Sequence, residues 1–512
     1  MFKFNLFTFI LIVYSQISNG QIIFHKAYPD QMNGSMGMEM GFIEAKDKGF
    51  LLGNGKTLMK VDSTGSKEWR YEFDSPVNPF ICVFSIINDF SKGYLLFGTR
   101  MFLSLDSSYN INWMKDISSS YRFFILESKK ADSVTFIHAG EAGIGNDFTP
   151  CLLKTDTSGN IIWAKIYNSN PVIESIRSME VASDGSIYVS GVSRSVINTT
   201  ALHYDGVVFK LNSMGAVQWS KRYANMGLDI YLYRIKQALD GNLILSGSRN
   251  FKPHLMKIDT SGNILWEKIY SAGFHGNAHD VFCTTDNGFA LVGEVTDTTM
   301  GWLGQTSIFI KTDSIGDLEW AKYMGGFGNV SASKIIGTTD KGYAIAGRRI
   351  YGSDYVLNLI KTDSLGNTGG CLDANTNVTI TNYNDSVMNF ALTDSSISAT
   401  TVPYFSNFPL IGTEVDICNF QGDAENDLSS EISIYPNPAN EIITITGLNT
   451  NSNKRQVIKL NDMTGRTIII QPLNTDNEKQ EINISCLSSG SYILSIESDG
   501  LNIQNKKVMI TK

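Results

Sequence analysis

The chain has 512 residues, of which 18% are charged and 11% are aromatic, and it contains 45 glycines. A chain of this length has room for two or three domains, and its composition is typical of an all-β protein with many tight turns. The net charge of −8 is spread thinly, without the clustered lysines and arginines that follow a phosphate backbone, so we expect no nucleic-acid partner.

The first twenty residues have the pattern of a secretory signal peptide. A short basic start precedes an apolar run over residues 6–14, and the small residues Ser18 and Gly20 stand just before Gln21. This run is shorter than the roughly 20 apolar residues that a membrane-spanning helix needs. We therefore expect residues 1–20 to be removed before Gln21, and no transmembrane segment elsewhere.

A unit of four strand-like segments then repeats along most of the chain. Each unit ends in a hairpin whose turn in most units contains Asp and Gly, and whose last strand carries a tryptophan. The six tryptophans are Trp69, Trp113, Trp163, Trp219, Trp266 and Trp320, at spacings of 44, 50, 56, 47 and 54 residues. Such periods predict propeller blades or a solenoid. We interpret the tryptophans as packing residues, because catalysis would not need six equivalent rings.

The seventh unit lacks its last strand and has Gly370 where the tryptophan should stand. The stretch "IIFHKAYPD", residues 22–30, matches the missing strand and places Phe24 at the tryptophan position. We therefore expect a seven-bladed β-propeller over residues 21–370 that is closed by its N-terminal strand. Such closure leaves no open sheet edge, whereas a solenoid would not need the split unit.

The hairpin turns are short in every unit, and the variation in repeat length lies in the other connections. Because variable loops on a rigid scaffold usually carry function, we expect a ligand to meet that face. The candidate ligand-face residues are Trp302, His275, His203 and His138. Trp302 lies outside the repeat register in a glycine-rich loop, where it suits either carbohydrate or protein contact or a local plug over the disc.

The histidines give no catalytic or metal-binding pattern. His254 and His279 map to the same face as His138, His203 and His275. These histidines are spread over different units, and none of them has a metal-ligand spacing such as HExxH. We interpret them as solvated loop residues. The acids of these loops are interpreted as solubilising: Glu141, Asp147, Glu294 and Asp297. We expect no cofactor and no metal.

Residues 371–430 interrupt the repeat with a stretch rich in Asn, Thr, Ser and Asp, which ends in an acidic run typical of an accessible linker. Cys371 and Cys418 bracket this segment. In an oxidising compartment they form the best candidate disulfide. Cys82 and Cys283 fall in apolar runs and are expected to be buried thiols.

A new pattern of short alternating strands with Gly, Asn and Asp turns runs over residues 431–512 and predicts a small β-sandwich. Its motifs are "YPNP" (Tyr435, Pro436, Asn437 and Pro438), "D-x-x-GR" (Gly465 and Arg466) and "L-x-x-G-x-Y" (Gly490 and Tyr492). In this order they resemble the type A C-terminal sorting domain of the Bacteroidetes type IX secretion system. The resemblance implies export to the outer-membrane surface or the medium of a Gram-negative bacterium, with the secretion machinery and its sortase-like peptidase as partners.

The repeat also resembles the tryptophan-docking repeat of quinoprotein propellers. Those enzymes typically use eight blades and adjacent cysteines, and the sequence has no Cys-Cys pair. We therefore expect a non-enzymatic binding module for a glycan or protein ligand. The alternatives are a secreted hydrolase or lyase that acts on polysaccharide or peptide, and a purely structural component of the cell envelope.

Overall fold

All regular elements of the described chain are β-strands that form small antiparallel sheets, as the sequence predicts. None of these elements is a helix with the length and apolarity that crossing a bilayer requires. The computed structural model describes residues 21–28, 40–73, 82–89, 93–144, 147–170, 172–196, 202–225, 228–273, 275–296, 305–325, 330–351, 354–368, 373–403, 415–416, 433–436, 439–446, 456–462, 467–472, 479–485, 487–488, 490–498 and 501–511. The expected signal peptide lies outside them.

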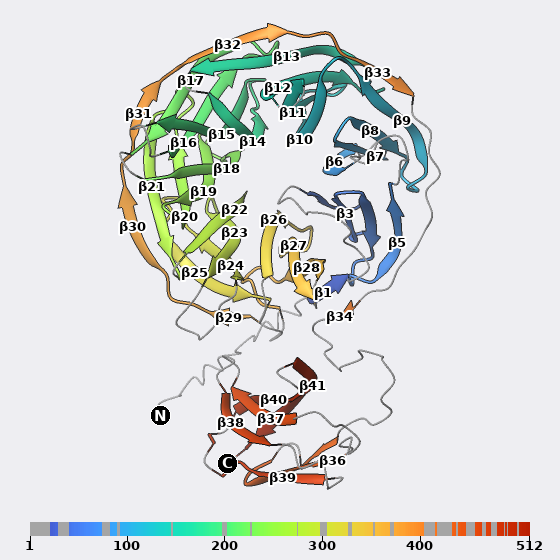
Figure 1. Ribbon diagram of the computed structural model, residues 1–512, viewed down its shortest axis with the longest axis vertical. Coiled ribbons are helices and arrows are strands. Elements are labelled where there is room, and N and C mark those ends of the chain that lie inside the picture. Colours follow the sequence, from blue (N-terminus) through green and yellow to red (C-terminus); the bar gives the residue numbers. More distant parts are fainter. Residues whose placement is uncertain are drawn as a thin grey trace, which may run out of the picture.

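Seven of the sheets lie around a common centre, and we call them together the ring (Figure 1). Sheet 1 contains β2 (Gly41–Glu44), β3 (Phe50–Asn54), β4 (Thr57–Val61) and β5 (Lys67–Glu72). Sheet 2 contains β6 (Val83–Asp89), β7 (Gly93–Gly98), β8 (Met101–Leu105) and β9 (Ile111–Ser118). Sheet 3 contains β10 (Arg122–Lys130), β11 (Thr135–Ile144), β12 (Asp147–Asp156) and β13 (Ile161–Asn170). Sheet 4 contains β14 (Ile173–Val181), β15 (Ile187–Val196), β16 (Leu202–Leu211) and β17 (Val217–Ala224). Sheet 5 contains β18 (Ile230–Gln237), β19 (Leu243–Arg249), β20 (Lys252–Ile258) and β21 (Ile264–Ser271). Sheet 6 contains β22 (His275–Cys283), β23 (Phe289–Thr296), β24 (Gln305–Thr312) and β25 (Leu318–Met324). Sheet 7 contains β26 (Val330–Gly337), β27 (Tyr343–Tyr351), β28 (Asp354–Thr362) and β1 (Phe24–Tyr28).

Sheet 7 is completed by the first described strand of the chain. β1 pairs antiparallel with β28, with Phe24 opposite Lys361 and Tyr28 opposite Leu357. This is the pairing that the sequence predicts for the incomplete seventh unit. The first strands of the sheets contact one another in series from β2 to β26, and β26 contacts β2. Sheet 7 therefore adjoins sheet 1.

One contact recurs between neighbouring sheets, and it explains the repeated tryptophan and glycine. Gly316 in a turn of sheet 6 has φ of 80°, and a Cβ added to it would lie 2.9 Å from the ring of Trp266 in sheet 5. The Tyr270 hydroxyl donates a hydrogen bond of 2.7 Å to the Gly316 carbonyl oxygen. A side chain at Gly316 would strain the backbone and collide with the ring. Sheet 2 is the exception, because Tyr109, with φ of 65°, stands at the equivalent turn position and its ring centroid lies 5.2 Å from that of Trp69.

β1 makes the same contact with the turn of sheet 1. A Cβ on Gly65, whose φ is 80°, would lie 2.6 Å from the ring of Phe24. The Tyr28 hydroxyl donates to the Gly65 carbonyl oxygen at 2.6 Å. Phe24 thus takes the place that a tryptophan occupies in the other sheets, and Tyr28 takes the place of Tyr270.

The chain after residue 372 returns around the outside of the ring in the reverse order of the sheets (Figure 1). We call its strands β29–β34 the belt. They add an outer strand to sheets 6, 5, 4, 3, 2 and 7 respectively: β29 (Ala374–Asn375), β30 (Thr379–Tyr383), β31 (Ser386–Asn389), β32 (Ala391–Ser396), β33 (Thr400–Pro403) and β34 (Val415–Asp416). This corrects the expectation of a segment separate from the repeat. The added strands satisfy the outer edges of these sheets, which would otherwise offer unpaired backbone groups.

A buried cluster of charges fastens the belt to sheet 5. The side chains of Arg249, Glu267 and Asp385 are fully buried. The Arg249 guanidinium pairs with Asp385, lies 3.3 Å from a Glu267 oxygen, and stacks 3.8 Å from the ring centroid of Tyr383. His254 Nε2 lies 3.0 Å from Glu267 Oε1. Burial disfavours the Glu267 carboxylate, but the contact with His254 outweighs it and lowers the pKa of Glu267 to about 2.

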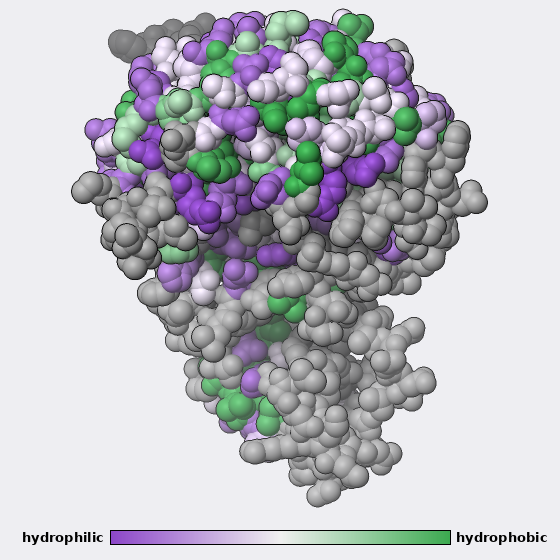
Figure 2. All heavy atoms as spheres, turned by 45° about the horizontal axis from the view of Figure 1, so that its top comes forward, coloured by the Kyte–Doolittle hydropathy of each residue, from purple (hydrophilic) through white to green (hydrophobic). Residues whose placement is uncertain are grey.

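Polar and apolar residues alternate over the outer face of the molecule. Figure 2 shows hydrophilic and hydrophobic residues interspersed over the coloured part of this view, without one extended apolar patch among them. In the belt itself most side chains are exposed, and Leu392, at 9% exposure, is the one buried residue among its described hydrophobic residues.

The tail forms two sheets around a core of its own. One contains β35 (Ser433–Tyr435), β36 (Ile442–Thr446) and β39 (Lys479–Asn483), and the other contains β38 (Thr467–Pro472), β37 (Gln456–Asp462), β40 (Gly490–Ser498) and β41 (Leu501–Ile510). Ile443 of the first sheet and Leu460 of the second belong to the same buried cluster. Tyr492 is buried, and its hydroxyl donates to the Ser488 carbonyl oxygen at 3.0 Å. Tyr435 is half exposed. Asn437, Pro438, Gly465 and Arg466 lie outside the described residues.

Candidate functional site

The innermost strand of six sheets carries a β-bulge, and a glycine of the second strand faces it. A Cβ on Gly247 would lie 1.8 Å from the Tyr231 carbonyl oxygen, and one on Gly293 would lie 1.8 Å from the Asn277 carbonyl oxygen. The residue after the bulge is polar in all six sheets: Ser85, Glu127, Ser178, Arg234, Asp280 and Lys334. The repeated bulge therefore gathers polar side chains at equivalent positions of the innermost strands.

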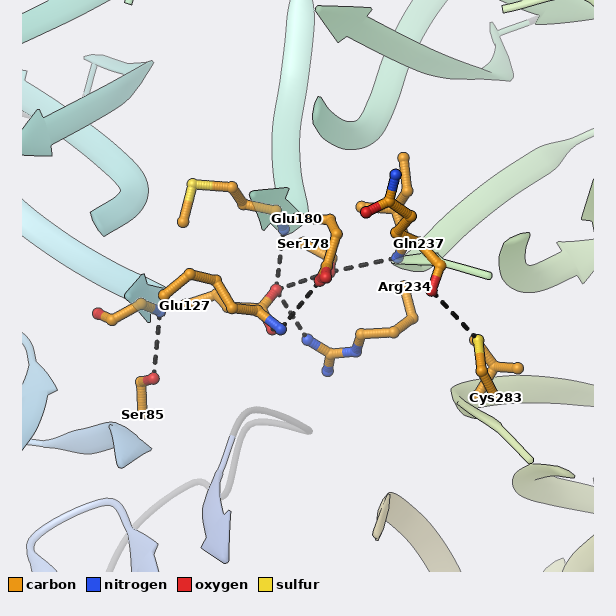
Figure 3. Close-up of polar contacts among 12 residues, drawn as sticks. Ser85, Glu127, Ser178, Glu180, Arg234, Gln237 and Cys283 are labelled. Carbon is orange, nitrogen blue, oxygen red and sulfur yellow. Dashed lines mark hydrogen bonds and ion pairs between the residues drawn. The ribbon is translucent and has the colours of Figure 1, made fainter. Parts of the chain in front are cut away.

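Glu127 is the centre of the network that these side chains form (Figure 3). One oxygen, Oε2, accepts hydrogen bonds from the Ser178 hydroxyl at 2.6 Å and the Met179 backbone N–H at 2.8 Å, and lies 3.3 Å from Arg234. Burial disfavours the carboxylate, but the positive charges of Arg234 and Lys129 outweigh it and hold the pKa of Glu127 well below its usual range. Glu127 is thus a buried anion that joins sheets 3, 4 and 5.

Asp280 extends the network to sheets 6 and 7. Its Oδ1 lies 3.2 Å from Arg234 Nε and accepts the Val281 backbone N–H at 2.9 Å. Its Oδ2 accepts the backbone N–H of Ile335, in sheet 7, at 3.0 Å. Arg234 therefore bridges two buried carboxylates. Such a network holds the innermost strands in fixed positions, because each buried charge has a partner.

A cavity of about 320 Å³ lies against this network. Its charged wall residues are Glu127, Lys129, Lys130, Lys236, Asp280 and Lys334, and the rest of the wall includes apolar side chains of β2, β6 and β26. We call it the axial cavity. Lys129 lies 3.0 Å from Glu180, and the acids around it raise its pKa although burial opposes this. The neighbouring charge of Lys129, together with burial, lowers the pKa of Lys236.

A row of aromatic rings lies beside the same strands in sheets 4 to 6. The ring centroids of Tyr204 and Tyr231 are 5.1 Å apart, those of Tyr231 and Tyr233 are 6.1 Å apart, and those of Tyr233 and His279 are 5.4 Å apart. The three tyrosines are partly exposed and His279 is buried. We call these four residues the aromatic row.

The structure separates the predicted ligand-face residues. His138 is fully buried in β11, where its ring nitrogens lie 2.9 Å from Ser128 Oγ and 2.8 Å from Thr155 Oγ1. Burial lowers its pKa to about 3. The prediction that His138 lies on a ligand face is therefore wrong. His203 is half-buried, with Nδ1 3.5 Å from Asp229 Oδ1. His275 is exposed at the start of β22, and Trp302 lies outside the described residues.

Two further histidines are also buried, contrary to their interpretation as solvated loop residues. His254 is in the cluster that fastens the belt, and His279 Nε2 lies 3.6 Å from Oε1 of the buried Glu294. Burial raises the pKa of Glu294, but His279 outweighs it, and the pKa is about 2. The physical reason is that the strands are longer than the sequence suggested, so that β11 and β22 include residues assigned to loops.

The polar network was not predicted from the sequence. A signal for it existed, because Glu127 directly follows the apolar run of residues 123–126, Arg234 directly follows residues 230–233 and precedes Ile235, and a glycine recurs in each second strand. Cys82 and Cys283 are half-buried free thiols rather than fully buried ones, and burial raises the pKa of Cys283 to about 11. Within the described residues, no group of His, Cys, Asp and Glu side chains is placed to hold a metal ion.

Comparison with known families and structures assigns the tail. Residues 433–511 match the family described as the secretion system C-terminal sorting domain. This tail directs export through the type IX secretion system, so the protein interacts with that machinery and is secreted or held at the outer-membrane surface. The predicted localisation is confirmed. The match concerns the tail, and no curated protein sequence matches the chain.

The solved structures that resemble this chain are distant. A protein of unknown function from Dyadobacter fermentans DSM 18053 is 9% identical with a TM-score of 0.37, covering 67% of this chain and 95% of the other. The extracellular domain of BT4673 from B. thetaiotaomicron is 9% identical with a TM-score of 0.16, covering 96% and 100%. Drosophila Plexin A in complex with Semaphorin 1b is 8% identical with a TM-score of 0.27, covering 66% and 87%. At these TM-scores the similarities carry no argument about function.

Proposed function

We propose that the protein is an exported binding module in which a seven-bladed β-propeller presents a ligand-binding surface outside the cell. The observation that carries the proposal is the sorting-domain match of residues 433–511, because a sorting domain exports the part of the chain that precedes it, which here is the ring. In this proposal residues 1–20 are a signal peptide, and residues 21–370 and the belt form the propeller closed by β1. Residues 431–512 form a β-sandwich that serves as the sorting signal for export.

Closure is supported by the contacts of β1. This strand completes sheet 7 and packs on the turn glycine of sheet 1 through Phe24 and Tyr28, as the tryptophan strands do elsewhere. A closed ring braced by a buried polar network is a rigid scaffold, and rigid scaffolds bind ligands without a large ordering cost.

The aromatic row favours a glycan or protein ligand. Partly exposed tyrosines offer an apolar ring face and a hydroxyl, which suits contact with sugar rings and with protein side chains. Tyr231 is the central ring of the row, 5.1 Å and 6.1 Å from its two tyrosine neighbours. It is therefore the residue whose removal should weaken binding most.

The test is a glycan array combined with a turnover assay on the same polymers, with the purified full chain and its Tyr231→Ala variant. Tyr435→Ala is the matched control, because Tyr435 is a half-exposed tyrosine of the tail. We expect saturable binding of one glycan class that Tyr231→Ala weakens and Tyr435→Ala does not, without release of products. Product release would favour the hydrolase or lyase alternative, and absence of any bound glycan would favour a structural role. Either result would overturn the proposal.

A further inference from the structure

Lysines outnumber carboxylates on the wall of the axial cavity. Four lysines and two carboxylates line it: Lys129, Lys130, Lys236, Lys334, Glu127 and Asp280. The volume of about 320 Å³ is roughly ten times the share of one liquid water, so the cavity can hold a small polyatomic group together with waters.

The two wall carboxylates are already engaged by other groups. Both lie close to Arg234, at 3.3 Å from Glu127 and 3.2 Å from Asp280. Glu127 also accepts hydrogen bonds from the Ser178 hydroxyl and from one backbone N–H. Asp280 also accepts hydrogen bonds from two backbone N–H groups. Glu127 Oε1 also lies 3.8 Å from the Lys129 ammonium. The negative charge of the two carboxylates is therefore shared between Arg234 and Lys129 and is only partly available to the other lysines.

Lys236 and Lys129 both line the axial cavity. The Lys129 ammonium lies 3.0 Å from Glu180. In the part of the chain that the structure describes, Lys236 has no carboxylate within ion-pairing distance. Two ammonium groups in the wall of one cavity repel each other, although solvent that reaches the Lys129 side chain, which is 25% exposed, screens part of this repulsion. The lowered pKa of Lys236, caused chiefly by Lys129, is the expected consequence.

We propose that the axial cavity binds an anionic group, a carboxylate, sulfate or phosphate, between the ammonium groups of Lys236 and Lys129. A lysine binds such oxyanions as a point charge with three donors, and an anion between the two would replace their repulsion by two attractions. The inference rests on the proposed binding function, because it assigns the charged part of the ligand to the centre of the ring. It implies that acidic ligands are preferred to neutral ones.

The test is isothermal titration of the full chain with sulfate, phosphate and glucuronate, at an ionic strength held constant with sodium chloride, and with glucose as the neutral comparison. Lys236→Gln removes one cation, and Lys48→Gln removes an exposed lysine of sheet 1 as the control. Lys236→Met removes the same charge with a side chain of similar length, in case the glutamine variant does not fold. Thermal unfolding without added oxyanion reports the folding of each variant.

We expect saturable binding of at least one oxyanion to the wild type and to Lys48→Gln, and at least a tenfold weaker affinity in Lys236→Gln. The melting temperature of Lys236→Gln without oxyanion should equal or exceed that of the wild type, because the repulsion is relieved. Binding of sulfate or phosphate alone identifies a tetrahedral anion, and binding of glucuronate identifies an acidic sugar; both support the proposal. Equal affinity in Lys236→Gln and wild type, or no saturable binding of any oxyanion, would overturn it. A neutral glycan ligand found on the array would in that case leave the proposed function standing.

Discussion

Replacing Asp385 with alanine should loosen the belt from sheet 5. Asp385 is the belt's contribution to the buried cluster, where it pairs with Arg249 and its backbone N–H donates to Glu267 Oε2 at 3.1 Å. The substitution leaves the Arg249 guanidinium buried with one carboxylate instead of two. Removing one partner of a buried ion pair costs about 3–5 kcal/mol, mainly because the remaining charge stays desolvated.

A matched substitution exists in the same belt. Asp394 of β32 pairs with Lys165 of β13 at 2.7 Å, but the two side chains are 26% and 15% exposed. An ion pair that solvent reaches contributes about 0–1 kcal/mol. The two aspartates thus differ mainly in burial, and Asp385→Ala should cost about 3 kcal/mol more than Asp394→Ala.

The assay is thermal and denaturant unfolding of the two variants and the wild type. For a unit of roughly 400 residues, with an unfolding entropy of about 2 cal/mol/K per residue, 3–5 kcal/mol lowers the melting temperature by about 4–6 °C. The double variant Arg249→Met/Asp385→Ala should cost less than the sum of the single variants, because the pair acts as a unit. Equal melting temperatures for Asp385→Ala and Asp394→Ala would refute the reasoning.

Three further predictions concern the closure, the acid response and the belt ends. Deleting residues 21–28 should lower the melting temperature markedly, because sheet 7 loses its fourth strand, and an unchanged melting curve would argue against closure by β1. The folded-state pKa of Glu294, about 2, lies below its ordinary value of 4.5, so its contribution of about 3 kcal/mol is present above pH 4.5 and is lost as the pH falls toward 2. Glu294→Gln should therefore flatten the loss of stability over that window, and parallel pH profiles of variant and wild type would contradict this. Cys371 and Cys418 lie outside the described residues but flank β29 and β34, which belong to sheets 6 and 7, and we predict that a disulfide joins them. Closing a loop of about 47 residues would contribute roughly 3–4 kcal/mol in the chain-entropy model, and peptide mapping that finds two free thiols in the exported protein would exclude it.

The repeat could be predicted from the sequence because its physical cause is local. Five tryptophans pack on a turn glycine of the next sheet, and Trp69 packs on Tyr109 at the equivalent turn position, so each tryptophan marks the last strand of one repeated unit. The seventh position was predictable for the same reason, since Phe24 and Tyr28 repeat the order of Trp266 and Tyr270 although the strand stands at the other end of the chain.

The belt could not be predicted in this way. Its strands are two to six residues long and mostly exposed, and each pairs with a strand far away in the sequence. A pattern of polar residues with few buried side chains is typical of a linker, and it is equally compatible with an outer strand. The decisive contact, Asp385 with Arg249, spans 136 positions and leaves no local trace.

The polar network and the buried histidines were missed because they depend on strand length and bulge position. Sequence alone ended the strand that contains His138 too early and began the strand that contains His279 too late, because β11 continues to Ile144 and β22 already begins at His275. The bulges turn Glu127 and Arg234 toward neighbouring sheets, and only the register shows this. The sequence could therefore predict the scaffold, while the arrangement of charge at its centre required coordinates.

The central claim is that the tail is a sorting signal and that the ring is the part of the protein that it exports. The most direct measurement is fractionation of cells that express either the full chain or a version that ends at residue 430, which retains the belt. We predict that the full chain reaches the surface or the medium, whereas the shortened chain stays in the periplasm and, once purified, unfolds at the same temperature as the ring of the full chain. Normal amounts of the shortened protein at the surface or in the medium would contradict the account.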